Sequence, residues 1–391
     1  MPADGGTPQN YGSYDITSAT LILIPQLNAK PVNGSSVSLV EPPAEAIAGS
    51  PAAAPPKAGA KNKFNAPPFA VSKKQKTTNV ISAPPPPAPP PISGVGIMDV
   101  GQGNCNMLIA QTGNIWAYYD VGYPLWFYIS SLPGNMRFAA PGYQGPIVQS
   151  NIANNPLQIY LSHWDWDHWR LGGLDPGLQL LDFTFPNQPI GPTAANFLAG
   201  LPNARKHMIN AGTPPFAGPG NSALYCCFPP GPNVPIAMII NNTGLAMSVP
   251  TRLPAINTTL HDIVLTGDAN FNSVPLPANV TANIAGITAV HHGSDNHGAA
   301  DNLVGPINAL GNQGYIAYSY GITTGGNHAY GFPVPAAVAK YQAANWSYAR
   351  STAEGANINV GPTAHGNIQM GAAVVIAQAG TAFSTLTYQM N

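Results

Sequence analysis

The stretch LQIYLSHWDWDHWRLGG, residues 157–173, decides how the chain folds and where its chemistry lies. Its apolar start, LQIYL, is typical of a buried strand and is followed by His163, Asp165, Asp167 and His168. Alternate residues of a chain that leaves a strand point the same way, so we expect His163 and Asp165 to converge on one metal ion. Asp167 and His168 then turn toward a second ion. Imidazole and carboxylate ligands together bind divalent transition metals.

A polar loop without metal, with Trp164 and Trp166 packed beneath it, is the competing interpretation of this cluster. Charged residues make up only 7% of the chain, whereas about 25% is typical of globular proteins. Because charge is so scarce elsewhere, two histidines and two carboxylates in so short a stretch favour the metal site over the polar loop.

Two further clusters follow apolar segments. Asp268 ends HDIVLTGD, where a carboxylate just past a buried strand is well placed to bridge two cations, and His291 and His292 end GITAVHH. Each signal alone is weak, because an aspartate at a strand end is often a turn residue or a helix cap. Vicinal histidines at a strand end point to opposite sides, so we expect one to bind metal while its neighbour forms a hydrogen bond or transfers a proton.

The overall composition excludes several classes of protein. The 391 residues carry a net charge of −1, which gives no strong field to attract nucleic acid or an anionic membrane. Three cysteines cannot build a disulfide framework, so a reducing compartment is expected. The first residues lack the basic start and apolar run of a secretory signal, and no apolar stretch approaches the ~20 residues that span a bilayer. We therefore expect a cytoplasmic protein without a membrane partner.

Residues 1–93 differ from the rest of the chain. They hold 18 of the 43 prolines, seven lysines and four acidic residues, a local net charge of +3. Proline fixes φ and removes a hydrogen-bond donor, so this Pro/Ala-rich segment is predicted to be a largely disordered, low-complexity arm that ends in a stiff polyproline spacer. Residues 18–27 could add one edge strand. The arm is interpreted as a soluble tether or the docking segment for a protein partner, with phosphate contacts by its lysines as the alternative.

The pattern of apolar and polar residues changes at residue 94. Short β-rich apolar segments are bounded by Gly, Asn or Pro, and they include VGIMDV, NMLIA, NIWAYYDVG, LQIYLSH, IAMII, GLAMSV, HDIVLTGD, GITAVHH and YIAYSYG. Helical patterns are fewer, and the best lie near residues 172–182 and 333–345. Many strands with a few helices predict two sheets covered by helices, an α/β sandwich, over residues 94–391.

The motifs, taken in order, resemble those of the metallo-β-lactamase-fold hydrolases. They are most similar to the branch that contains the nuclease domain of the competence protein ComEC and its soluble relatives, over about residues 94–376. The matching stretches are GIMDVGQGNC, YLSHWDWDHWRLGGL, IINNTGLAM, IVLTGDAN, ITAVHHGSD and IAYSYGITTGGNHAYGFP. The resemblance implies an αββα sandwich and a hydrolase with two divalent metal ions.

The resemblance also implies a set of metal ligands. The family's His-x-His-x-Asp-His motif is met between residues 163 and 168, with Asp165 in place of the second histidine. Asp268 matches the bridging carboxylate, and the pair that follows GITAV matches the last ligand motif. The implied ligands are His163, Asp165, Asp167, His168, Asp268, His291 and His292. Asp99, in DVGQG, is implied to lie beside the metals.

Four departures from the family pattern affect the site. Asn104 stands where ComEC-like sequences usually carry aspartate, Trp169-Arg170 adds one residue before the Gly-Gly pair, and Phe332 occupies the position of a usual histidine, although His328 lies four residues earlier. The family's middle histidine has no clear equivalent. The two candidates, for each of which a structural role is expected, are His207 and His261. The first metal site is therefore expected to be short of ligands.

The expected chemistry follows from two Zn²⁺ or Mn²⁺ ions about 3.5–4 Å apart, which generate a bridging hydroxide as the nucleophile. Asp165 makes the first site harder and favours Mn²⁺ over a pure zinc preference. Asp167, His291 and His328 are the residues expected to act in catalysis. Either His328 or the vicinal histidine that does not bind metal is expected to protonate the leaving group.

The substrate class is narrowed by charge. Residues 94–391 carry seven Lys and Arg against eleven Asp and Glu, a net charge of −4, which cannot build the basic groove that a long nucleic acid requires. A small or short phosphodiester substrate is expected. The alternatives are a non-phosphate hydrolase acting on a lactone, amide or ester, and a catalytically weakened protein that binds a partner through the arm.

Overall fold

The structure of the protein is a computed structural model. The structure describes residues 92–111, 113, 115–124, 129, 131–133, 136–141, 143, 145–146, 157–212, 215–228, 236–252, 260–307, 314–321, 332–353, 367–371 and 387–390. The first strand begins at Ile92, two residues before the predicted start of the domain. The rest of the predicted arm, with its edge strand over 18–27, and His328 lie outside the described residues.

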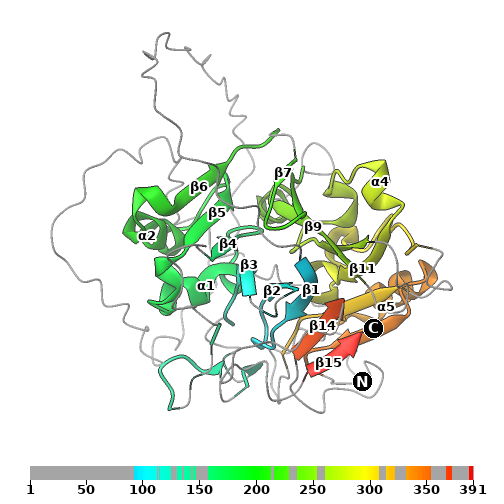
Figure 1. The fold of residues 1–391 in the computed structure, drawn as a ribbon, viewed down its shortest axis with the longest axis horizontal. Helices are drawn as coiled ribbons and strands as arrows, with labels where there is room; N and C mark the ends of the chain where they lie inside the picture. The colour runs from blue at the N-terminus through cyan, green and yellow to red at the C-terminus, as the bar shows by residue number, and fades with distance from the viewer. Residues whose placement is uncertain are drawn as a thin grey trace, which may run out of the picture. The chain divides into compact units, whose positions relative to one another are not determined.

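The described strands form two sheets (Figure 1). The first has the strand order β15-β14-β1-β2-β3-β4-β5-β6, and the second has the order β13-β12-β11-β10-β9-β8-β7. The strands of the first sheet are β1 Ile92–Ile97, β2 Cys105–Ala110, β3 Ile115–Val121, β4 Gln158–Tyr160, β5 Asp182–Pro186, β6 Lys206–Ile209, β14 Asn367–Gly371 and β15 Thr387–Met390. Those of the second are β7 Phe216–Ala217, β8 Ala223–Cys226, β9 Leu245–Arg252, β10 Leu260–Leu265, β11 Ile284–Thr288, β12 Tyr315–Tyr318 and β13 Tyr348–Ser351.

Helices α1 Trp166–Leu174 and α2 Pro192–Gly200 cover the outer face of the first sheet, and α4 Ala278–Thr281 and α5 Pro335–Ala343 cover that of the second. Helix α3, Ile236–Asn242, lies between β8 and β9 in the chain. Strand alternation divides the core accordingly. In β2, Met107 and Ile109 pack in a cluster shared with α1 and α2, whereas Leu108 faces the second sheet. In β11, Ile287 packs in a cluster shared with α4 and α5, whereas Ala285 faces the first sheet. The predicted α/β sandwich of two sheets is therefore confirmed.

The predictions for individual helices had mixed outcomes. The helix expected over 333–345 is confirmed as α5, which has proline at its start. The helix expected over 172–182 was wrong, because α1 begins earlier, at Trp166, and ends at Leu174. An Asx turn, in which Gly177 donates to the Asp175 carboxylate (N–Oδ1, 2.8 Å), stops the helix before β5.

The segment IAMII was predicted as a strand and forms the start of helix α3 instead. A continuous apolar run has no period of its own, so sequence pattern cannot separate a buried strand from a buried helix. None of the helices in the described part of the chain is long and apolar enough to cross a bilayer.

Helix α1 lies against the end of β3 at a point where no side chain fits. A Cβ atom added to Gly122 would lie 1.8 Å from the main-chain oxygen of Asp167. The same oxygen accepts a hydrogen bond from the Asn104 amide (2.9 Å), and Gly122 donates to the Asn104 carbonyl (2.7 Å). These contacts hold the first turn of α1, which carries two of the predicted metal ligands.

Replacing Gly122 by alanine is expected to lower the free energy of unfolding by about 1–3 kcal/mol, the range for overpacking a tight interior. Backbone must move, because the clash is with a carbonyl oxygen and not with a flexible side chain. Urea titration of the metal-free protein measures the effect. Gly200→Ala is the matched control, since its Cβ would have nothing within 4 Å and alanine favours the helix by up to about 1 kcal/mol. Equal stability of the two variants would contradict the packing argument.

Candidate metal centre

The predicted ligands lie where parallel strands of both sheets end. Strands β3 to β6 run parallel in the first sheet, and β10 to β13 run parallel in the second. The carboxyl ends of neighbouring parallel strands share one edge of a sheet. His163 follows β4, Asp268 follows β10 and His291 follows β11, so side chains far apart in the sequence gather at this edge.

The loop after β4 becomes helical sooner than expected. Asp165 is the N-cap residue of α1, with an extended backbone and no side-chain capping bond, and Asp167 and His168 stand in the first turn. The loop is therefore not extended, and the expected alternation of side chains along it was wrong. The Asp165 carboxylate instead lies beside His163, with Oδ2 3.4 Å from Nε2.

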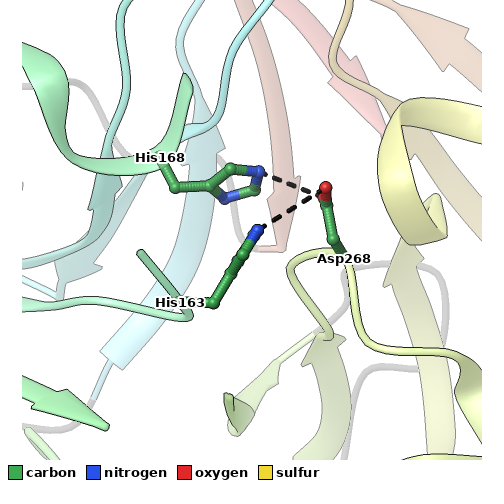
Figure 2. Close-up of side chains that lie close together, drawn as sticks. All are labelled: His163, His168 and Asp268. Carbon is green, nitrogen blue, oxygen red and sulfur yellow. Dashed lines mark ion pairs between the residues drawn. The ribbon is translucent and has the colours of Figure 1, made fainter. Parts of the chain in front are cut away.

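The carboxylate of Asp268 lies at the centre of the cluster, and each of its oxygens faces a different pair of histidines. Oδ1 is 3.1 Å from Nε2 of His168 and 3.9 Å from Nε2 of His292. Oδ2 is 3.4 Å from Nε2 of His291 and 3.7 Å from Nε2 of His163. Figure 2 shows the rings of His163 and His168 directed at this carboxylate from the other side of the site.

The cluster therefore divides into two half-sites that share Asp268. The second half-site is completed by Asp167, whose Oδ2 is 3.3 Å from Nε2 of His292. The first half-site consists of His163, Asp165, His291 and Oδ2 of Asp268. The second consists of Asp167, His168, His292 and Oδ1 of Asp268. Ligand atoms of His168 also lie within 4.8 Å of those of His163 and Asp268, so the two half-sites adjoin at this ring. All seven predicted ligands meet here, and their binding of metal stays a prediction.

Two histidines present a lone pair to the centre, because their other ring nitrogen faces an acceptor. Nδ1 of His292 is 2.6 Å from the main-chain oxygen of Ser319, which can only accept, so Nδ1 carries the proton. Nδ1 of His168 is 2.8 Å from Oδ2 of Asp120. Such partners fix the tautomer and ring orientation of metal-binding histidines.

A buried hydrogen-bond network fixes the tautomer of His163 in the same way. Ser162 donates its hydroxyl to Oδ2 of Asp120 (2.8 Å) and its amide to Oδ1 (2.7 Å). With its proton committed, the Ser162 hydroxyl accepts from Nδ1 of His163 (2.9 Å). Nε2 of His163 is then also left with a lone pair that faces the centre.

Several atoms at the centre are buried and lack a hydrogen-bond partner among the described residues. They are Nε2 of His163, His168 and His292 and Oδ1 of Asp268. An unsatisfied buried polar group costs about 1–3 kcal/mol, so such a concentration calls for a bound partner. A divalent cation in each half-site would satisfy these atoms. The donor set of imidazoles and carboxylates fits Zn²⁺ or Mn²⁺.

The charges within the cluster shift the pKa values of its members. Burial alone would raise the pKa of Asp268, but the neighbouring His291 and His168 outweigh it and hold that pKa well below its usual range. Burial alone would lower the pKa of His168, whereas Asp268 and Asp120 raise it well above its usual range. Burial lowers the pKa of His291. In the metal-free cluster these shifts favour an ionised Asp268 and a second proton on His168, at the Nε2 atom that faces Oδ1 of Asp268, and a cation in the half-site would take the place of that proton.

The two candidates for the missing middle histidine lie elsewhere. His207, on β6, pairs with Asp182 (Nε2–Oδ2, 3.6 Å), and His261, on β10, pairs with Asn283 (Nδ1–Oδ1, 3.0 Å). Neither belongs to the groups of converging ligand atoms among the described residues. The ring of Phe332 stacks on that of His292, with centroids 6.2 Å apart, and so forms an apolar wall.

Residues that support the ligands were missed in the sequence. Asp120 is fully buried and has φ 63°, a left-handed conformation that aspartate tolerates better than most residues. Asp120 was missed in the sequence because it lies in NIWAYYDVG, which has the pattern of a core strand. The signal that could have identified it is an acidic residue at the end of an apolar strand, directly before Val-Gly. Asp99, predicted to lie beside the metals, accepts a hydrogen bond from the Gly101 amide (3.1 Å).

Comparisons with known proteins give structural similarity alone. No protein-family model matches the chain, and no curated protein matches it. Tm1679, described as a metal-dependent hydrolase of the β-lactamase superfamily, aligns over 66% of this chain and 95% of its own at 11% identity and a TM-score of 0.35. The metallo-β-lactamase SMB-1, bound to 2-mercaptoethanesulfonate, covers 47% of this chain and 65% of its own at 15% identity and a TM-score of 0.26.

A further similar structure is MEM-A1, a subclass B3 metallo-β-lactamase isolated from a soil metagenome library. It covers 51% of this chain and 72% of its own at 14% identity and a TM-score of 0.26. These TM-scores are low, so the case for a metal centre rests on the geometry of the side chains.

Proposed function

We propose that this chain is a binuclear metal-dependent hydrolase of the metallo-β-lactamase type, with one divalent cation in each half-site. One observation carries the proposal: the buried, unpartnered nitrogen and oxygen atoms of three histidines and an aspartate converge on one point. The pairing of each Nδ1 with an acceptor aims the opposite ring nitrogen at that point.

Divalent cations in these positions, when bound, supply Lewis-acid activation of water and stabilise the negative charge that develops on the attacked group. The chain's own residues set the geometry. Asp268 links the half-sites through its two oxygens, and the buried His168 and His292 hold the second half-site rigid. Asp165 and Asp167 are 18% and 23% exposed. The site is therefore open on their side, where Asp167 can accept a hydrogen bond from an attacking water.

We propose a small or short phosphodiester as the substrate, in line with the resemblance of the motifs to the ComEC branch. The deficit of cations in residues 94–391 supports a substrate held mainly by the metal centre and not by a basic groove. His328 is the proposed donor of a proton to the leaving group, and His291 takes that role only if it does not bind metal. A lactone or ester is the second candidate, because the apolar ring of Phe332 stacks on His292 at the position of a usual histidine.

Metal analysis together with a substrate panel tests the proposal. Elemental analysis of the protein, purified without chelator, is expected to give about two transition-metal ions per chain. The Mn²⁺- or Zn²⁺-loaded protein is then expected to hydrolyse bis-p-nitrophenyl phosphate faster than an acyl-homoserine lactone. The reverse order would favour the lactone or ester candidate. Absence of bound metal after incubation with excess Zn²⁺ or Mn²⁺ would refute the proposal.

A further inference from the structure

The first half-site lacks the middle histidine of the family pattern. His207 and His261 are occupied by other partners away from the centre. What remains from β4 and β10 is His163, Asp165 and one oxygen of Asp268, three protein ligands of which one is shared with the second half-site. A further imidazole would give this half-site as many ligands of its own as the second, which has Asp167, His168 and His292.

We propose that His291 is that ligand, so that the His291–His292 turn supplies one imidazole to each half-site. This inference rests on the proposed binuclear function and assigns a residue within it. Nε2 of His291 lies 3.4 Å from Oδ2 of Asp268, the oxygen that faces His163. Nε2 of His292 lies on the side of the other oxygen and 3.3 Å from Asp167. The two neighbouring rings therefore serve opposite sides of one carboxylate.

The backbone of the turn explains how adjacent residues reach the same centre. His291 has φ 46° and ψ 51°, His292 has φ 56° and ψ 15°, and Gly293 has φ 90°. In an extended strand these two side chains would point to opposite faces, as we expected from the sequence. Left-handed conformations are unfavourable for residues other than glycine, and two in a row persist only where the surroundings impose them.

Those surroundings connect the turn directly to Asp268. The amide of His291 donates to the carbonyl of Gly267, the residue before Asp268 (3.2 Å). The amide of Val290, just before the turn, donates to the hydroxyl oxygen of Tyr341 on α5 (2.8 Å). The turn and the bridging carboxylate are thus one hydrogen-bonded unit.

Asn241 on α3 provides the partner that a ligating His291 needs. Its side-chain amide lies 3.4 Å from Nδ1 of His291. The oxygen and nitrogen of an asparagine amide exchange places by a rotation of 180°. With the oxygen toward the ring, the amide accepts the Nδ1 proton and Nε2 offers its lone pair to the cation. His291 is 13% exposed, whereas His292 is 1% exposed, so the ring of His291 is the more accessible of the two.

The test replaces each histidine by glycine, which adopts the left-handed backbone without strain. His291→Gly is therefore expected to fold with a melting temperature of the metal-free protein no lower than that of the wild type. Its Zn²⁺ stoichiometry, measured by equilibrium dialysis and elemental analysis, is expected to fall from about two ions to about one. The affinity of the lost ion is expected to drop about a hundredfold or more, beyond the loss caused by removing an outer partner. Added imidazole, which fills the vacated position, is expected to restore the second ion.

The matched controls are His292→Gly and His207→Gly. His292→Gly is expected to lose the ion of the second half-site, which imidazole restores, and His207→Gly is expected to keep both ions. Retention of two ions at wild-type affinity in His291→Gly would overturn the assignment of His291 and leave the binuclear function standing. Absence of metal from the wild type would instead overturn the proposed function itself. A His291→Gly variant that loses both ions, and that imidazole does not restore, would also contradict the assignment to one half-site.

Discussion

Replacing Asp268 by asparagine is expected to remove both cations and to lower phosphodiester turnover by on the order of a hundredfold or more. The carboxylate faces His163 and His291 with one oxygen and His168 and His292 with the other. Asparagine keeps the shape but offers one oxygen and one NH₂ group, which cannot bind a cation. The shared negative charge, which the whole cluster depends on, is lost as well.

Elemental analysis and turnover of bis-p-nitrophenyl phosphate measure the effect. Asp262→Asn is the matched control, because Asp262 lies near the other end of the same strand, β10, and is also buried. Burial raises the pKa of Asp262, so burying its charge costs free energy, a cost that the neutral amide of asparagine does not have. The control is expected to keep both ions. Two ions retained at wild-type affinity in Asp268→Asn would show that this carboxylate is not the shared ligand.

The gathering of the ligands could be predicted from the sequence because strand ends are visible in it. Each ligand cluster follows an apolar segment, and the ends of parallel strands meet at one edge. It was the resemblance of the motifs to the metallo-β-lactamase-fold hydrolases that implied a common site for His163, Asp268 and His291. The division into two half-sites was also expected, although the argument for it assumed an extended loop.

The start of helix α1 could not be predicted, because it is determined by contacts from other parts of the chain. Tryptophan and aspartate at its first positions are poor helix formers. The first turn forms there because the carbonyl of Asp167 packs against Gly122 and accepts a bond from Asn104. Tertiary packing overrides local helix propensity at this point, and the hydrophobic period of the local sequence does not indicate where the helix begins.

The direction of the His291 and His292 rings was unpredictable for a related reason. Strand alternation sends neighbouring side chains to opposite faces, and only a left-handed turn brings both to one centre. Gly293 marks a place where such a turn is possible, but a glycine after a strand is compatible with many turns. Sites with unusual backbone conformation are where pattern-based reasoning is expected to fail.

Replacing Asp120 by alanine is expected to lower the free energy of unfolding of the metal-free protein by about 3–5 kcal/mol, the range for removing one partner of a buried ion pair. The Asp120 carboxylate is fully buried and accepts from the Ser162 amide, the Ser162 hydroxyl and Nδ1 of His168. The variant leaves three buried donors without their acceptor. Because domains are stable by only about 5–15 kcal/mol, the loss is expected to be evident in urea denaturation.

A second substitution at the same position shows whether Asp120 orients the metal ligands or only stabilises the fold. Asp120→Asn retains an acceptor for the Ser162 amide but turns an NH₂ group toward His168, so it is expected to be less destabilised while Zn²⁺ affinity still falls about 10–100-fold. Isothermal titration at a temperature where the variant is folded measures the affinity. Asp182→Asn, which breaks the half-exposed pair with His207, is expected to change stability by no more than about 1 kcal/mol and to bind Zn²⁺ as the wild type does. Unchanged Zn²⁺ affinity in Asp120→Asn would mean that Asp120 holds the fold together without orienting His168.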